Sequence, residues 1–67
     1  MALISVYKKG VCIREICAAQ AYIDYESGFV NMFDGLEWRT DVSGATKITR
    51  RIENGIVHYT VILPDKA

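Results

Sequence analysis

The sequence contains few of the residues that staple small proteins together. Its 67 residues include two cysteines, one histidine and one proline. A structural zinc site needs four closely spaced ligands, which the two cysteines and the distant His58 do not supply. Cys12 and Cys17 would point to opposite faces of a continuous strand, so we expect reduced thiols, with Cys17 in the core. Because a core of this size is marginal without a staple, self-association is expected to add stability.

Long apolar runs are also missing, as is the basic and apolar start of a signal peptide. No stretch approaches the roughly 20 apolar residues that cross a bilayer. Hydrophobic residues make up 51% of the chain and charged residues 24%, a balance typical of globular proteins. We therefore expect a single domain over residues 1–67, located in the cytoplasm and without membrane contact.

Neither sign of charge predominates. Eight basic and eight acidic side chains balance each other, whereas a dedicated nucleic-acid domain is usually strongly basic. Basic residues nevertheless gather near both ends of the chain and acidic residues in its middle, so the folded protein should have a basic and an acidic side. The basic residues are Lys8, Lys9, Arg14, Lys47, Arg50 and Arg51, and the acidic ones are Asp24, Glu26, Asp34, Glu37 and Asp41.

Sequence motifs of catalysis are absent as well. The chain has no G-x-S-x-G elbow, no H-E-x-x-H motif and no phosphate-binding loop. A solvated surface histidine is the simpler interpretation of His58. Carboxylates that act as acid and base need a cleft that raises one pKa, which a domain of this size rarely encloses. We predict that the protein is not an enzyme and binds no cofactor and no metal.

The clearest structural signal is Asn54-Gly55, which lies between two runs rich in β-branched residues. Asn-Gly favours a type I′ turn, because both central residues of that turn need a positive φ. The pattern predicts a terminal hairpin of strands 46–53 and 56–63, followed by a short C-terminal tail, 64–67.

The two-residue turn also sets the register of this hairpin. Arg51 should lie opposite His58, and Ile48 opposite Val61. The apolar side chains then gather on one face and most polar ones on the other, a separation that a shift of one residue would destroy. The apolar face comprises Ile48, Ile52, Val57, Tyr59, Val61 and Leu63, and the polar face Lys47, Thr49, Arg51, Glu53, His58 and Thr60.

Residues 11–25 alternate over an unusual length. The odd-numbered positions are apolar apart from Glu15, which indicates a half-buried strand that would bend near Ala18 and Ala19. A helix over 12–25 is the alternative, because this segment is rich in good helix formers.

The remaining segments complete a β-rich plan. Residues 3–8 indicate a first strand that turns at 9–10, and 36–40 a short strand. Residues 28–34 form either a strand or a helix, since Phe29, Met32, Phe33 and Leu36 have helical spacing. We predict an all-β fold, a small antiparallel meander or half-open barrel of five to six strands. The class becomes α+β if 12–25 or 28–34 is helical.

A protein-binding module fits these features best: a subunit, adaptor or inhibitor that acts by protein–protein contact. Open strand edges can pair with a partner or with a second copy, so a homodimer is possible. The alternative is a nucleic-acid-binding β-domain that uses the basic face of the last hairpin. The single tryptophan is either an interface anchor or the main core residue. The predicted partner-binding residues are Lys47, Arg51, His58, Glu37, Trp38 and Arg39.

Overall fold

The computed structural model describes residues 1–65, with the side chains of all of these except Thr40 and Asp41. Residues 66 and 67 of the predicted tail lie outside this range. The fold is all-β as predicted, with seven strands and no helix in the described residues, so both helical alternatives, 12–25 and 28–34, are wrong. The strands are β1 Ala2–Lys8, β2 Val11–Ala18, β3 Gln20–Asp24, β4 Phe29–Phe33, β5 Trp38–Val42, β6 Lys47–Glu53 and β7 Ile56–Ile62.

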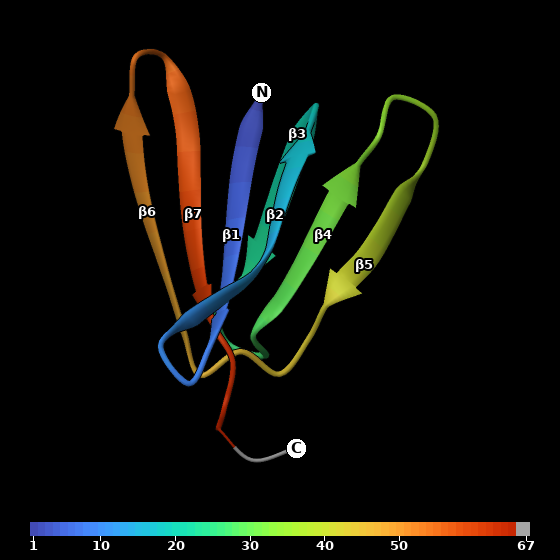
Figure 1. The fold of residues 1–67 in the computed structure, drawn as a ribbon. Helices are drawn as coiled ribbons and strands as arrows, with labels where there is room; N and C mark the ends of the chain where they lie inside the picture. The colour runs from blue at the N-terminus through green and yellow to red at the C-terminus, as the bar shows by residue number, and fades with distance from the viewer. Residues whose placement is uncertain (66–67) are drawn as a thin grey trace.

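The strands form two sheets that share one core. A four-stranded sheet has the order β2-β1-β7-β6, and a three-stranded sheet has the order β3-β4-β5. The sheets splay apart from the corner where β2 leads into β3 (Figure 1). Within the described residues no strand pairing joins β5 to β6. The arrangement is half-open, as predicted, but it has seven strands instead of five or six.

One pairing departs from a simple meander. β1 pairs with β7 in parallel, with Ile4 opposite Tyr59 and Val6 opposite Val61. In Figure 1 the first and last strands lie side by side in the middle of the four-stranded sheet. Every other pairing in the described part of the chain is antiparallel. The predicted meander is therefore wrong at this position, because the two ends of the chain meet in the sheet.

The terminal hairpin has the predicted register. Arg51 lies opposite His58 and Ile48 opposite Val61. Asn54 and Gly55 have φ values of 53° and 76°, as a type I′ turn requires. The turn at 9–10, which joins β1 to β2, has the same conformation.

The long alternating segment breaks into two strands at Ala19. In β3 the odd-numbered Ala21 and Ile23 face the core, as predicted, but in β2 the even-numbered Ile16 and Ala18 do so. Ala19 belongs to neither strand. Because side chains alternate in direction, this one extra residue reverses which parity faces inward. The predicted bend is confirmed, and the predicted single apolar face is not.

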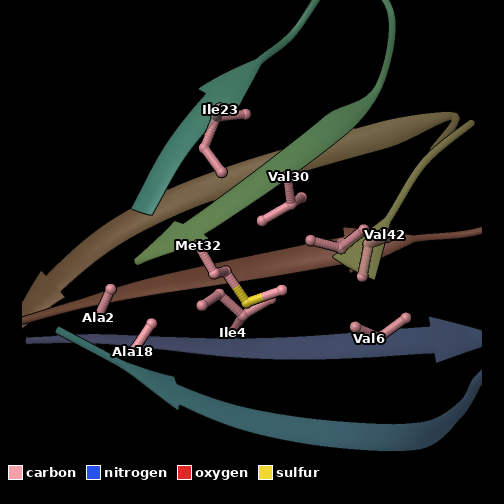
Figure 2. Packing of buried hydrophobic residues seen from close by; sticks show 9 residues of the cluster. Ala2, Ile4, Val6, Ala18, Ile23, Val30, Met32 and Val42 are labelled. Carbon is pink, nitrogen blue, oxygen red and sulfur yellow. The ribbon is translucent and has the colours of Figure 1, made fainter. Parts of the chain in front are cut away.

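The core lies between the two sheets. Ile4 of β1 and Met32 of β4 point toward each other across it (Figure 2). Ile4, Val6, Val30 and Val61 are the largest fully buried side chains. The complete buried cluster is Ala2, Ile4, Val6, Ala18, Ile23, Val30, Met32, Val42 and Val61. The buried cluster consists of short or flexible side chains and contains no aromatic residue.

The two cysteines share one face of the four-stranded sheet. Cys12 lies opposite Tyr7 and Cys17 opposite Leu3, because a register irregularity between Val6 and Tyr7 shifts the pairing of β1 with β2. Both thiols are free and exposed. The expectation of opposite faces, with Cys17 in the core, is therefore wrong.

Candidate functional site

The hairpin residues Lys47, Arg51 and His58 come together as the sequence predicts. They lie on the outer face of the four-stranded sheet, because their neighbours Ile48 and Val61 point toward the core. Arg51 is directly opposite His58, and Lys47 lies farther along β6. All three occur on one surface, which we call the hairpin face.

This hairpin face is less basic than its three named residues suggest. The Arg51 Nε atom lies 3.5 Å from the Glu53 Oε2 atom. Glu15 projects from the same side of the sheet, opposite Ser5. Two carboxylates therefore offset the two permanent cations, so this surface has little net charge with which to gather phosphates.

The other predicted segment, Glu37 to Arg39, lies on the three-stranded sheet. Trp38 begins β5 opposite Phe33, and the ring centroids of the two residues lie 5.3 Å apart at an interplanar angle of 37°. Trp38 is 51% exposed, so the alternative of a core tryptophan is wrong. Arg39 lies opposite the buried Met32, so it is on the other side of the sheet from Trp38, and the predicted segment does not form one face.

The outer face of the three-stranded sheet carries a group of aromatic side chains that we call the aromatic face. Tyr22 lies opposite Asn31, and Phe33 opposite Trp38. Tyr22 is 64% exposed and Phe29 is 42% exposed, so this surface is largely open to solvent. Its members are Tyr22, Phe29, Asn31, Phe33 and Trp38.

Sequence reasoning missed most of this face. Phe29 and Phe33 were grouped with Met32 because of their helical spacing, yet a period of two was also present. Val30 and Met32 alternate with the aromatic residues and are buried. That alternation is the signal that could have predicted an outward aromatic face.

A shallow, open depression lies on the aromatic face. Tyr22, Asn31 and Trp38 line it, and its volume is about 290 Å³. Two exposed rings beside an amide offer flat apolar contact together with a hydrogen-bonding group. Because the depression is shallow and open, it can contact an extended side chain of a partner but cannot enclose a small-molecule substrate.

The Asp34 carboxylate organises the turn that presents Trp38. Asp34 Oδ1 accepts hydrogen bonds from the backbone N–H groups of Leu36 at 2.9 Å and Glu37 at 3.1 Å. Its other oxygen pairs with the Arg39 guanidinium. The Leu36 N–H, then Arg39 and the Glu37 N–H, lower the pKa of Asp34 to about 2. Arg39 is therefore neutralised within the protein and is not a spare cation for a partner.

A second turn of similar design joins β3 to β4. Asp24 Oδ1 accepts hydrogen bonds from the backbone N–H groups of Glu26 and Ser27, at 3.1 Å and 3.2 Å. The hydrogen bonds from Ser27 and then Glu26 lower the pKa of Asp24. Asp24 lies opposite Phe29 on the aromatic face, whereas Asp34 lines the depression that contains Met32 and Arg39.

The charges divide between the two sheets. Residues 20–39, which hold most of the three-stranded sheet, include four carboxylates and Arg39 as the only cation. Residues 1–18 and 46–63 hold the four-stranded sheet and include six cations and two carboxylates. The predicted acidic and basic sides therefore follow the two sheets, with the side chain of Asp41 outside the described set.

A second depression, of about 250 Å³, lies at the β2–β3 corner. Its polar side chains are Cys17, Asp34 and Arg39, of which the last two pair with each other. Cys17 and His58 lie on the same face of the four-stranded sheet, each opposite Leu3, so strand β1 separates them. No group of three histidine, cysteine, aspartate or glutamate side chains that could hold a metal occurs among the described residues. The one carboxylate that lines this depression, Asp34, is already paired with Arg39 and so is a poor base for the thiol.

Comparison of the chain with protein-family models, curated proteins and solved structures finds no match. Over residues 1–65 the chain forms no helix of the length and apolar character needed to cross a membrane. The hairpin face and the aromatic face are therefore the two candidate binding surfaces.

Proposed function

We propose that the protein is a non-enzymatic protein-binding module whose aromatic face docks a basic segment of a partner protein in the cytoplasm. The observation that carries this proposal is the half-exposed Trp38, which lines a shallow depression with Tyr22 and Asn31 on the acidic sheet. Exposed aromatic clusters are typical of interfaces, where tryptophan and tyrosine contribute much of the binding free energy.

Charge complementarity selects the kind of partner. Lysine and arginine side chains bind the faces of aromatic rings, with about 0.5–2 kcal/mol from each cation–π contact. Asp24 lies opposite Phe29 on this face, and hydrogen bonds from the Ser27 side chain, then from backbone N–H groups, lower the pKa of its carboxyl. The ionised Asp24 carboxylate beside the rings attracts cations and repels phosphates, so a basic peptide fits this surface better than a nucleic acid.

Binding of this kind suits a subunit, adaptor or inhibitor. A rigid sheet presents its side chains in place, so little conformational freedom is lost when a partner docks. The hairpin face is the site of the alternative function. A nucleic acid that used Lys47 and Arg51 is the alternative function, and its support is the common face of these residues with His58.

The emission of Trp38 provides a direct test. It is the only tryptophan in the chain and lies on the proposed site. A tryptophan-free peptide rich in lysine and arginine should change the emission in a saturable and salt-sensitive way, whereas an acidic peptide of equal length should not. Tyr22→Ala should weaken binding about tenfold.

Tyr25 supplies a matched control for Tyr22. It is 59% exposed but lies in the β3–β4 turn, outside the strands. Tyr25→Ala should bind the basic peptide as the wild type does. Equal losses in both variants, or no saturable response to any basic peptide, would refute the proposed site.

A single-stranded deoxythymidine oligonucleotide tests the alternative. Binding that survives Tyr22→Ala and is lost in Lys47→Glu/Arg51→Glu would assign the function to the hairpin face and to nucleic acid. An affinity capture from nuclease-treated lysate, with wild type and Tyr22→Ala side by side, would then name the partner. A protein captured by the wild type alone is the expected result.

A further inference from the structure

The outer edge of β6 is a regular strand edge that no other strand covers in residues 1–65. β6 is seven residues long, contains no proline and pairs with β7 without a register shift. The other edges are less regular or shorter. Register shifts interrupt the pairing of β2 and of β5 with their neighbours, and β3 has five residues. A long and even edge is a template for pairing with another strand.

The sequence of β6 is complementary to itself when its direction is reversed. Ile48 and Ile52 lie at equal distances on either side of Arg50, and Lys47 and Glu53 occupy the two ends. Reversal therefore places isoleucine opposite isoleucine and a cation opposite a carboxylate.

We propose that two copies of the protein pair antiparallel through β6, about a two-fold axis that passes through Arg50. Lys47 of each copy then lies opposite Glu53 of the other, and Ile48 opposite Ile52. Such an interface is isologous, so each favourable pair occurs twice. The two four-stranded sheets merge into one continuous sheet.

The backbone of β6 fits this register. In the β6–β7 hairpin the pair that flanks the two-residue turn is Glu53 and Ile56. Hydrogen-bonded residues alternate along an antiparallel ladder from that pair, so the N–H and C=O groups of Ile48, Arg50 and Ile52 are directed toward the free edge. Pairing around Arg50 joins these outward residues to one another.

The side chains also fit. Ile48, Arg50 and Ile52 are on the core-facing side of β6, whereas Lys47 and Glu53 are on the outer side. A two-fold axis perpendicular to the sheet preserves these sides. Ile52 is 62% exposed in the monomer and gains Ile48 of the second copy as a neighbour. Within one copy Glu53 also forms an ion pair with Arg51. Because that pair is exposed to water, it competes only weakly with the proposed pairing of Glu53 with Lys47 of the second copy.

Arg50 limits the strength of the dimer. Its side chain meets its own copy across the axis, and like charges directly opposite each other in a sheet are unfavourable. The dimer should therefore be reversible and sensitive to concentration, and Arg50→Thr should tighten it. The aromatic face lies on the other sheet, so Tyr22→Ala should leave dimerisation unchanged.

Charge reversal tests the register by sedimentation velocity. Lys47→Glu places two glutamates opposite each other, and Glu53→Lys places two lysines, so each variant should dimerise at least about tenfold more weakly than the wild type. An equimolar mixture of the two variants restores both opposite-charge pairs and should form a heterodimer. The double variant, Lys47→Glu/Glu53→Lys, should dimerise like the wild type.

Hydrogen exchange gives an independent readout of the same edge. Concentration should increase the protection of the Ile48, Arg50 and Ile52 amides in the wild type and not in Lys47→Glu. Circular dichroism confirms that each variant is folded. A wild type that stays monomeric, or a dimer that is indifferent to both charge reversals, would overturn the proposal.

Discussion

A Cβ atom at Gly28 would overlap the carbonyl oxygen of Ala45. The Ala45 N–H in turn donates a hydrogen bond of 3.1 Å to the Gly28 carbonyl. Gly28 ends the turn between β3 and β4, and Ala45 lies in the connection from β5 to β6. This backbone contact ties the three-stranded sheet to the chain that enters the four-stranded sheet, and it leaves no room for a side chain at Gly28.

Replacement of Gly28 should therefore destabilise the protein for two reasons. Gly28→Ala adds a steric clash to a residue with a φ of 73°. Gly44 has a φ of 74° and open space where its Cβ would be, so Gly44→Ala isolates the backbone cost. We expect the free energy of unfolding, measured by urea denaturation, to fall by about 1 kcal/mol in Gly44→Ala and by about 3 kcal/mol in Gly28→Ala. Equal losses would show that the contact with Ala45 relaxes without cost.

The core should be sensitive to the loss of two methyl groups. Val30 is fully buried between the sheets, whereas Val11 is 60% exposed at the start of β2. Val30→Ala should lower the unfolding free energy by about 2 kcal/mol, through lost burial and the cavity left behind. Val11→Ala, with the same chemical change, should cost about 0.5 kcal/mol. Similar denaturation midpoints for the two variants would contradict the assigned core.

The turn between β1 and β2 can be improved. Lys9 has a φ of 54°, a conformation that asparagine tolerates better than lysine. Lys9→Asn should stabilise the protein by about 0.5 kcal/mol, because it gives this turn the Asn-Gly pair of the terminal hairpin. Lys8→Asn removes the same charge from a strand position and should destabilise. A loss of thermal stability in Lys9→Asn would contradict the turn conformation.

Asp34 should make stability depend on acid pH. Its pKa is about 2 in the folded protein and near 3.8 ordinarily. Because the folded pKa is the lower one, its stabilising effect is complete above the ordinary pKa and is lost as pH falls from about 4 to about 2. Wild type should be more stable than Asp34→Asn at neutral pH, and the difference should shrink across that window. A difference that does not vary with pH would rule out this carboxylate as its source.

The hairpins were predictable because turn chemistry is local. Asn54-Gly55 adopts positive φ values whatever packs elsewhere, and its two-residue length sets the pairing of Arg51 with His58. The predicted common face of Lys47, Arg51 and His58 follows from that register alone. The alternation along 11–25 also indicated strand correctly, because a period of two is a property of neighbouring residues.

The aromatic face was not predictable in this way. Phe29 and Trp38 are large and apolar, and hydrophobicity alone does not distinguish a core position from an exposed one. The core is instead filled by short side chains such as Val30, and the second sheet covers the face that carries them. Which side of a strand is covered depends on the position of the other sheet.

By itself, the sequence determined the turns, the register of the terminal hairpin and the separation of acidic from basic segments, because each depends on residues close together in the chain. It favoured the all-β class, but the structure was needed to exclude helices over 12–25 and 28–34. Only the tertiary structure decided the parallel pairing of β1 with β7, the reversal of alternation at Ala19 and the exposure of Trp38. These features depend on contacts between distant segments. Their free energy comes from the burial of one shared core, which no local pattern encodes.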